Sequence, residues 1–247
     1  MNPRQSRTAR LRALSAAVLL LTVVCVTGAA PARVTPPLNG CVPDSARVVP
    51  VTVPEANETL PVAVLGHGRR MVVLSNQSDE NLCSWLPFAT TLIARGYAVA
   101  LWDFGDASPV TELDHVVRTL RTATGVPRPF LAGASWGAKV SLIVAAQARP
   151  QVRGVVTLSA ERILHPSTDV LDYVRKVRSP LLLVTADHDP YGSAEAASLF
   201  LEAAPTHHKS LVSIPGTLHG TALLTAPAPT AVVPRILAFL LASEAGE

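Results

Sequence analysis

Short apolar, β-branched runs alternate with longer amphipathic stretches over residues 47–243 of this chain. Buried parallel strands are continuous apolar runs, and a crossover helix usually joins one parallel strand to the next. We expect strands over 47–54, 61–65, 71–74, 97–102, 129–133, 152–158, 181–185 and 210–214, the first two forming an antiparallel edge pair. We expect helices over 82–95, 112–124, 136–148, 169–177, 193–203 and 227–243, with Pro234 breaking or kinking the first turns of the last one. The pattern predicts an α/β fold: a doubly wound, mostly parallel sheet with helices on both faces.

The N-terminal segment is typical of an export signal. Four arginines within the first 12 residues precede an apolar stretch over 13–26 and a run of small residues over 27–32. A basic region, a short apolar region and a small-residue cleavage region define a secretory signal peptide. The apolar stretch is shorter than the roughly 20 residues that a membrane-spanning helix needs. We expect a signal peptide over 1–32, cleaved within 29–32, an irregular lead-in over 33–46, and one domain over 47–247.

The net charge of +3 belongs to this N-terminal segment. Removing its four arginines leaves 17 basic against 18 acidic residues. Nucleic-acid binding needs a concentrated basic surface, which the remaining chain lacks. We therefore expect no nucleic-acid partner and no stable membrane insertion after signal cleavage.

The cysteines are consistent with export. Cys25 lies in the apolar stretch, which leaves Cys41 and Cys83 in the mature chain. An even pair in an exported protein predicts a disulfide, although two independent buried thiols are the alternative. Cys25 could instead carry a lipid, but Val24 precedes it where a lipoprotein signal has a small residue. The interpretation is a secreted protein, with a lipid anchor at Cys25 as the minor alternative.

A G-x-S-x-G motif stands between a predicted strand and a predicted helix. It reads Gly133-Ala134-Ser135-Trp136-Gly137 and follows the strand over 129–133 directly. A sharp turn in this position exposes the serine hydroxyl above the carboxyl end of the sheet. Ser135 is therefore the candidate nucleophile, with a structural Gly-Ser turn as the alternative.

Two later strand ends carry the partners that a nucleophilic serine requires. Asp187 and Asp189 follow the strand over 181–185, and His219 follows the strand over 210–214. A serine hydroxyl needs a histidine base, and the histidine needs a carboxylate that orients it. Ligands in open α/β sheets bind at the carboxyl ends of the strands, where all these residues are expected.

The order serine, acid, histidine and the context of each residue resemble the α/β-hydrolase family over essentially all of residues 47–243. The resemblance implies acyl transfer, with Ser135 attacking a carbonyl and His219 moving the proton. The acid of that family ends a G-x-x-D loop, and Ala186-Asp187-His188-Asp189 matches this with Ala for Gly. This match selects Asp189 and leaves Asp187 in reserve.

The resemblance also implies an oxyanion hole made by two backbone N–H groups. One belongs to Trp136, the residue after the nucleophile. The second is expected at Gln77, but Ser75-Asn76 replace the usual His-Gly before it. The substitution leaves open whether Asn can adopt the backbone conformation required of Gly there.

About 20 residues separate the strands on either side of the usual lid position, so we expect no large cap domain. The expected walls of the open site are Trp85, Trp136, Ile163 and Tyr191, and the expected substrate is a small uncharged ester. No metal-ligand spacing, phosphate loop or dinucleotide fingerprint is present in the sequence, and we expect no cofactor and no metal. A peptidase or acyltransferase with the same three residues, or a non-catalytic binding protein on this scaffold, are the alternatives. The sequence leaves the oligomeric state open.

Overall fold

The computed structural model describes residues 38–228 and 230–244. The predicted signal peptide, with Cys25, and the first part of the lead-in lie outside the described residues. No helix in the described ranges is both long and apolar enough to cross a membrane.

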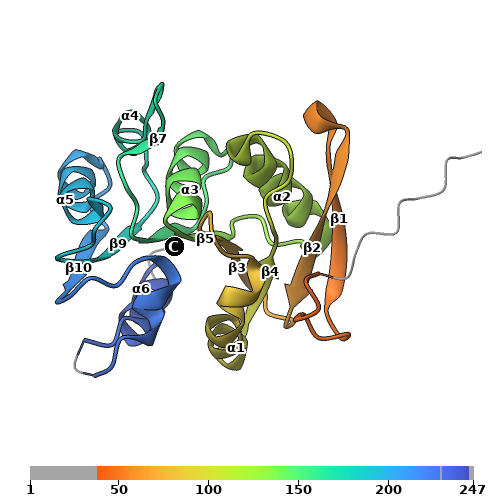
Figure 1. Ribbon diagram of the computed structural model, residues 1–247. Helices are drawn as coiled ribbons and strands as arrows, with labels where there is room; N and C mark the ends of the chain where they lie inside the picture. Colours follow the sequence, from red (N-terminus) through yellow and green to blue (C-terminus); the bar gives the residue numbers. More distant parts are fainter. Residues whose placement is uncertain (1–37, 229, 245–247) are drawn as a thin grey trace, which may run out of the picture. The chain divides into compact units, whose positions relative to one another are not determined.

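One sheet organises the described residues, in the order β1-β2-β4-β3-β5-β6-β9-β10 (Figure 1). Its strands are β1 (Arg47–Val53), β2 (Glu58–Leu65), β3 (Arg70–Ser75), β4 (Tyr97–Leu101), β5 (Phe130–Ala134), β6 (Gly154–Leu158), β9 (Leu181–Ala186) and β10 (Lys209–Ile214). β1 pairs antiparallel with β2, and β2 pairs antiparallel with β4. The other pairings are parallel. The predicted mostly parallel sheet is confirmed, with β1 as the edge strand and β2 inside it.

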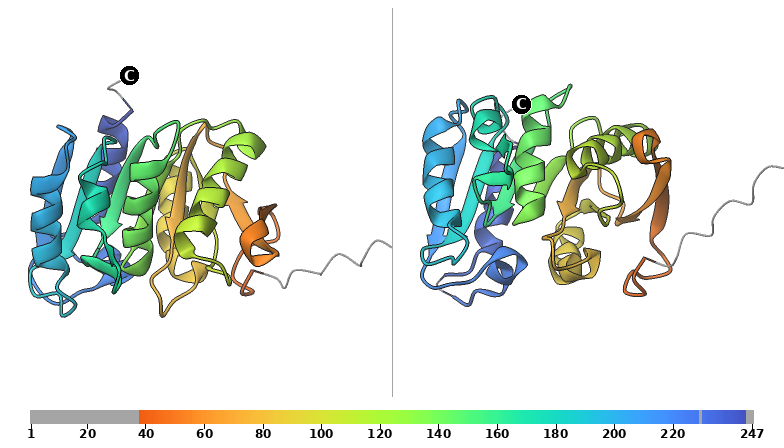
Figure 2. Two further views of the ribbon diagram at one scale, coloured as in Figure 1. Left: turned by 90° about the horizontal axis from the view of Figure 1, so that it is seen from above. Right: turned by 45° about the horizontal axis from the view of Figure 1, so that its top comes forward.

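Helices cover both faces of this sheet (Figures 1 and 2). α1 (Leu86–Ala94) and α6 (Val233–Ala242) pack on one face, and α2 (Pro109–Thr124), α3 (Trp136–Gln147), α4 (Leu171–Val174) and α5 (Ser193–Ala203) lie on the other. Each face has its own apolar core, the first around Trp85, Phe88 and Phe130 and the second around Leu113, Ile143 and Phe200. Successive residues of a strand face opposite sides, so continuous apolar strands supply both cores.

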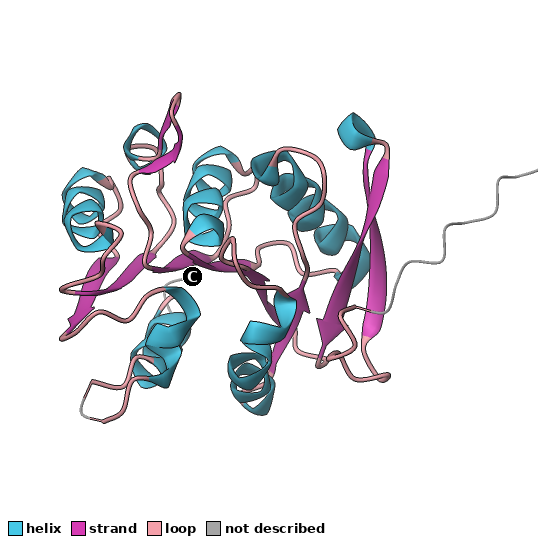
Figure 3. Ribbon diagram, viewed as in Figure 1, coloured by secondary structure: helices cyan, strands magenta, loops and turns pink. Residues whose placement is uncertain are grey.

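Four predicted helices differ from the structure (Figure 3). The helix predicted over 112–124 begins earlier, at Pro109. The last helix begins at Val233 instead of residue 227, because Pro234 has no N–H group and fits only the first turn. The helix predicted over 82–95 starts as a 3-10 turn, Leu82–Trp85, before α1. The helix predicted over 169–177 shortens to α4. A small antiparallel ribbon of β7 (Ile163–His165) and β8 (Thr168–Asp169) precedes α4 and was not predicted.

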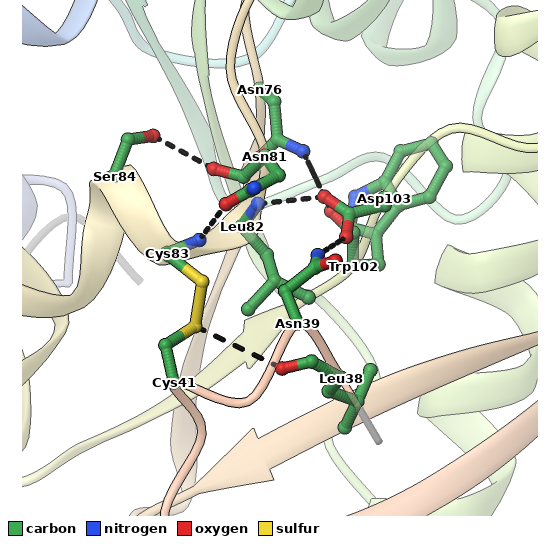
Figure 4. The surroundings of a disulfide bond; sticks show 10 residues. All are labelled: Leu38, Asn39, Cys41, Asn76, Asn81, Leu82, Cys83, Ser84, Trp102 and Asp103. Carbon is green, nitrogen blue, oxygen red and sulfur yellow. Dashed lines mark hydrogen bonds between the residues drawn. A yellow bond between two sulfur atoms is a disulfide. The ribbon is translucent and has the colours of Figure 1, made fainter. Parts of the chain in front are cut away.

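The predicted disulfide joins Cys41 to Cys83, with Cα atoms 5.9 Å apart (Figure 4). Beside it the carboxylate of Asp103, which follows β4, accepts hydrogen bonds from Asn39, from Asn76 and from the backbone N–H of Leu82. The two segments that the disulfide connects therefore meet at Asp103. This carboxylate also anchors Asn76, in the loop that follows β3.

Removing the disulfide is expected to lower the free energy of unfolding by about 2–4 kcal/mol. The bond closes a loop with a sequence separation of 42, which restricts the unfolded chain. Urea unfolding of a Cys41→Ser, Cys83→Ser double variant measures the loss. Dithiothreitol should destabilise the wild type by a similar amount and leave the double variant unchanged. An unchanged wild-type midpoint under reduction would contradict the prediction.

A buried carboxyl group, Glu112, holds the loop that follows β4. Its side-chain oxygens accept hydrogen bonds from the N–H groups of Gly105 and Ala107, at 3.1 and 2.8 Å. Burial raises the pKa of Glu112 from 4.5 to about 7 despite these N–H groups, which lower it, and the neighbouring Glu58 adds to the rise. Glu112 therefore keeps its proton in the folded protein over a pH range in which the unfolded chain has released it.

Glu112 is expected to make the protein less stable as pH rises from about 4.5 to about 7. The folded state binds the extra proton in this window, so the contribution is complete below pH 4.5 and is lost as pH passes through 7. The loss is at most ~3 kcal/mol. Urea unfolding at about pH 5 and pH 8 should show that the free energy of unfolding falls less between these pH values in Glu112→Gln than in the wild type. Parallel profiles for the two proteins would exclude Glu112 as the source.

Candidate active site

Ser135 occupies a strained turn between β5 and α3. Its φ of 47° and ψ of −109° lie where side chains are disfavoured. Two glycines permit the turn: a Cβ on Gly133 would collide with the carbonyl of Gly137, and a Cβ on Gly137 with that of Ser75. The N–H of Ser135 donates to the carbonyl of Leu158 on β6 at 2.8 Å. The turn therefore holds the Ser135 side chain at the carboxyl end of the parallel strands.

His219 and Asp189 form a hydrogen-bonded pair. Nδ1 of His219 lies 2.8 Å from Oδ2 of Asp189, whose side chain has no exposed surface. Burial raises the pKa of Asp189, but the Tyr191 N–H and the Ser193, His219 and Ser159 side chains together lower it below its ordinary value. Asp189 is therefore an ionised carboxylate at neutral pH, which holds the proton of His219 on Nδ1 and leaves Nε2 as the basic nitrogen.

Asp187 has a different partner. Its Oδ1 accepts a hydrogen bond from the N–H of Gly216 at 2.8 Å. This bond connects the loops that follow β9 and β10. The structure thus places Asp189 against His219, and Asp187 closes the loop beneath it.

The loop that follows β3 lies beside the start of α3. The carbonyl of Asn76 accepts the N–H of Gly137 at 3.0 Å. Neither the N–H of Gln77 nor that of Trp136 donates a hydrogen bond to a described group. Asn76 is not among the residues with positive φ, so Asn in place of Gly causes no strain. Both N–H groups therefore remain candidate oxyanion donors.

The side chain of Gln77 connects this loop to the His219 loop. Its Oε1 accepts the N–H of Thr221 at 3.0 Å, and its Nε2 donates to Asp79. A Cβ on Gly220, which has a φ of 57°, would collide with that Oε1. The glycine after His219 therefore suits this left-handed backbone conformation, and a side chain in its place would displace the Gln77 amide.

Comparison with solved structures identifies the fold. A monoacylglycerol lipase from Paleococcus ferrophilus superposes with a TM-score of 0.65 at 17% identity, over 74% of this chain and 99% of that one. The esterase domain of a Rhodothermus marinus protein gives 0.65 at 24% identity, over 81% and 98%. The Pyrococcus furiosus esterase Pf2001 gives 0.68 at 18% identity, over 80% and 92%.

This chain has the α/β-hydrolase fold. No protein-family model matches its sequence, and no curated protein sequence matches it. The fold class expected from the alternation of strands and helices and from the residues around Ser135 is confirmed.

The α/β-hydrolase fold brings an unexpected residue, Glu161, into this site. Ser135 Oγ donates to Glu161 Oε1 at 2.9 Å, and His219 Nε2 lies 3.6 Å from the same oxygen. No hydrogen bond joins Ser135 Oγ to His219 within the described residues. The carboxylate thus stands between the candidate nucleophile and the candidate base.

Lys139 holds Glu161 from the other side. Its Nζ lies 2.7 Å from Glu161 Oε2 and donates to the carbonyl of Ile163 at 3.1 Å. The side chains of both charged residues are mostly buried. The Lys139 ammonium also lies 5.1 Å from the centre of the Trp136 ring. Lys139 is one helical turn after Ser135, so α3 positions both residues.

Glu161 could have been suspected from the sequence by its place in the fold. It comes three residues after the end of β6, at the sheet edge where Ser135 and His219 also lie. Nothing in the local sequence indicates that its side chain turns toward Ser135. That direction depends on Ser159, which has a φ of 55°, and on the buried Lys139.

The expected pocket walls are partly wrong. Trp85 has no exposed surface and packs in the core against Phe88, because the 3-10 turn directs it inward. Tyr191 and Ile163 are exposed, and the Tyr191 ring lies 4.4 Å from the His219 ring. Trp136 packs edge-on against His165 of the unpredicted β7 strand. Tyr191, Trp136 and the β7–β8 ribbon therefore flank the site, and Trp85 does not.

Two further features bear on ligands. A half-open, mostly apolar pocket of about 420 Å³ lies beyond the His219 loop, lined by Phe88, Leu224 and Val233 together with Glu80 and Thr221. A group of His, Cys, Asp and Glu side chains able to hold a metal ion is absent from the described residues.

Proposed function

We propose that this protein is a secreted serine hydrolase that cleaves carboxylic esters through an acyl-enzyme intermediate. The observation that carries the proposal is the strained Ser135 turn at the same sheet edge as the His219–Asp189 pair. The lipase and esterases with the same fold support ester hydrolysis. The N-terminal sequence and the Cys41–Cys83 disulfide support export.

The reaction begins when the Ser135 hydroxyl turns from Glu161 to His219. Its oxygen attacks the ester carbonyl carbon while Nε2 of His219 takes the proton. The carbonyl oxygen becomes an oxyanion, which the N–H groups of Trp136 and Gln77 stabilise. His219 then protonates the departing alcohol and leaves an acyl group on Ser135. A water molecule, deprotonated by His219, releases the acid and restores Ser135.

Asp189 supports both halves of this cycle. Its carboxylate fixes the tautomer of His219 and stabilises the imidazolium formed in each proton transfer. The depressed pKa of Asp189 keeps this carboxylate charged at neutral pH. The Gln77–Thr221 hydrogen bond maintains the His219 loop at a constant position relative to the oxyanion donors.

Covalent labelling with a fluorophosphonate probe tests the proposal directly. Peptide mapping should find the label on Ser135, and p-nitrophenyl esters of increasing acyl length should be hydrolysed. Absence of both labelling and hydrolysis would contradict the proposal and favour a non-catalytic binding protein. Products formed with water and an added alcohol in competition separate hydrolysis from acyl transfer, and a parallel peptide-amide assay tests for a peptidase.

A further inference from the structure

The Glu161 carboxylate loses a hydrogen bond in the proposed reaction. In the structure, Oε1 accepts a hydrogen bond from the Ser135 hydroxyl, with 2.9 Å between the two oxygens. That hydroxyl has one proton, and attack requires it to be donated to Nε2 of His219 instead. Glu161 therefore loses its donor at the step in which Ser135 becomes reactive.

Glu161 is held in place when this happens. Its Oε2 lies 2.7 Å from Lys139 Nζ, and the Lys139 side chain is only 9% exposed. Lys139 is in turn fixed by its hydrogen bond to the Ile163 carbonyl and by the Trp136 ring. Among the described residues, Lys139 is the ion-pair partner of the buried Oε2 atom. Moving the carboxylate to solvent would also leave the Lys139 ammonium buried without its ion-pair partner.

A mostly buried carboxylate that loses a donor is costly unless another donor replaces it. His219 Nε2 gains a proton at this step but lies 3.6 Å from Oε1, which is too far for a hydrogen bond, and it must give that proton to the departing alcohol. The other group that can supply a donor is the substrate. The reacting carbonyl carbon stands about 3 Å from the serine oxygen in a productive complex. Since Oε1 is 2.9 Å from that oxygen, Oε1 and the carbonyl carbon lie within about 6 Å of each other, and a donor two to four bonds from that carbon can reach Oε1.

We propose that Glu161, held by Lys139, is a specificity-determining residue that selects esters with a hydroxyl or ammonium donor next to the scissile carbonyl. The donor takes the place on Oε1 that Ser135 vacates when it turns to His219. An ester without such a donor leaves the carboxylate unsatisfied in the transition state. The proposal rests on the proposed esterase function and deepens it by naming the class of substrate.

Two positions on an ester satisfy this requirement. The donor can be on the acyl side, as in a 2-hydroxyacyl group, or on the alcohol side, as in a 2-hydroxyethyl or glyceryl ester. The shared chemistry is a hydrogen-bond donor within reach of Oε1, and matched esters distinguish the two sources.

The test compares esters that differ by one hydroxyl group. Ethyl butanoate is paired with ethyl 2-hydroxybutanoate for the acyl side and with 2-hydroxyethyl butanoate for the alcohol side. For each pair, the kcat/KM of the hydroxylated ester is divided by that of its partner. This ratio is then divided by the ratio of the two rate constants for alkaline hydrolysis, which corrects for the electronic effect of the hydroxyl on the ester. The wild type should prefer one hydroxylated ester by about 10- to 100-fold, as expected for a hydrogen bond to a charged acceptor.

Two variants assign this preference to Glu161. In Glu161→Ala the corrected preference should fall to about one, whatever the change in the absolute rates. In Glu161→Gln the preference should be intermediate, because the amide oxygen accepts a hydrogen bond but carries no charge. Glu195→Gln, an exposed carboxylate on α5, is the matched control and should keep the wild-type preference.

Two outcomes would overturn the inference: no preference in the wild type, or the same preference in Glu161→Ala as in the wild type. If that unchanged preference came with an equal acceleration of all esters, the carboxylate would only obstruct Ser135. Fluorophosphonate labelling of Ser135 in each variant shows that the protein is folded and that its nucleophile reacts. If Glu161→Ala does not fold, the reduced preference of Glu161→Gln tests the inference instead. Failure of the proposed function differs from these outcomes, since no ester would then be cleaved and Ser135 would not be labelled.

Discussion

Ser135→Ala is expected to lower kcat/KM for ester hydrolysis by at least about 10⁴-fold and to abolish fluorophosphonate labelling. The substitution removes the atom that forms the acyl-enzyme and leaves the oxyanion donors in place. The free energy of unfolding should stay within about 1 kcal/mol of the wild type or rise, because alanine removes only a hydroxyl from this strained turn. Initial-rate kinetics and urea unfolding of the same preparation measure both quantities.

The matched control for this prediction is Ser141→Ala on α3, the helix that follows Ser135. Ser141 is fully buried and its Oγ has no hydrogen-bond partner among the described residues. Removing that hydroxyl should leave kcat/KM and labelling within about twofold of the wild type, since no hydrogen bond is lost with it. Equal activity of Ser135→Ala and Ser141→Ala would rule out Ser135 as the nucleophile.

Asp189→Asn is expected to reduce kcat by about 10³- to 10⁴-fold with little change in structure. An asparagine can donate to Nδ1 of His219, which favours the tautomer with its proton on Nε2, where the base must be free. The amide also cannot stabilise the imidazolium by its charge. The pH dependence of kcat, measured with a p-nitrophenyl ester, should show the remaining activity shifted to higher pH, where hydroxide can replace the base.

Asp187→Asn provides the comparison two residues away. Asp187 accepts the Gly216 N–H and does not contact His219, so the asparagine oxygen can keep its hydrogen bond. We expect less than about a tenfold loss of kcat, from a small displacement of the His219 loop. A larger loss in Asp187→Asn than in Asp189→Asn would reverse the assignment of the acid.

Much of the sheet could be predicted because the parallel strands are buried on both faces. Runs such as 97–102 and 181–185 are continuous and apolar, and the structure has strands within one residue of these bounds. The predictions are wrong where a proline interrupts a helical pattern or where tertiary contacts determine the local structure. Pro234 delays the last helix, and the β7–β8 ribbon is too short to produce a period of its own.

The individual candidates in the site could be predicted to different extents. Ser135 was recognisable because its motif requires glycines whose Cβ atoms would collide with neighbouring backbone. Trp85 was misplaced because a position near a strand end does not reveal whether a side chain points into the core or outward. The effect of Asn76 could be judged only from its backbone conformation, which shows that no positive φ is required.

By itself the sequence determined the fold class, the order of Ser135, Asp189 and His219, and the two cysteines available for pairing. These follow from period, turn chemistry and residue type, which are local properties of the chain. Only the tertiary structure decided that Asp189 contacts His219 while Asp187 closes a loop, and that Glu161 lies between Ser135 and His219. These contacts depend on side-chain directions that long-range packing sets, above all the buried Lys139, whose charge requires a carboxylate beside it.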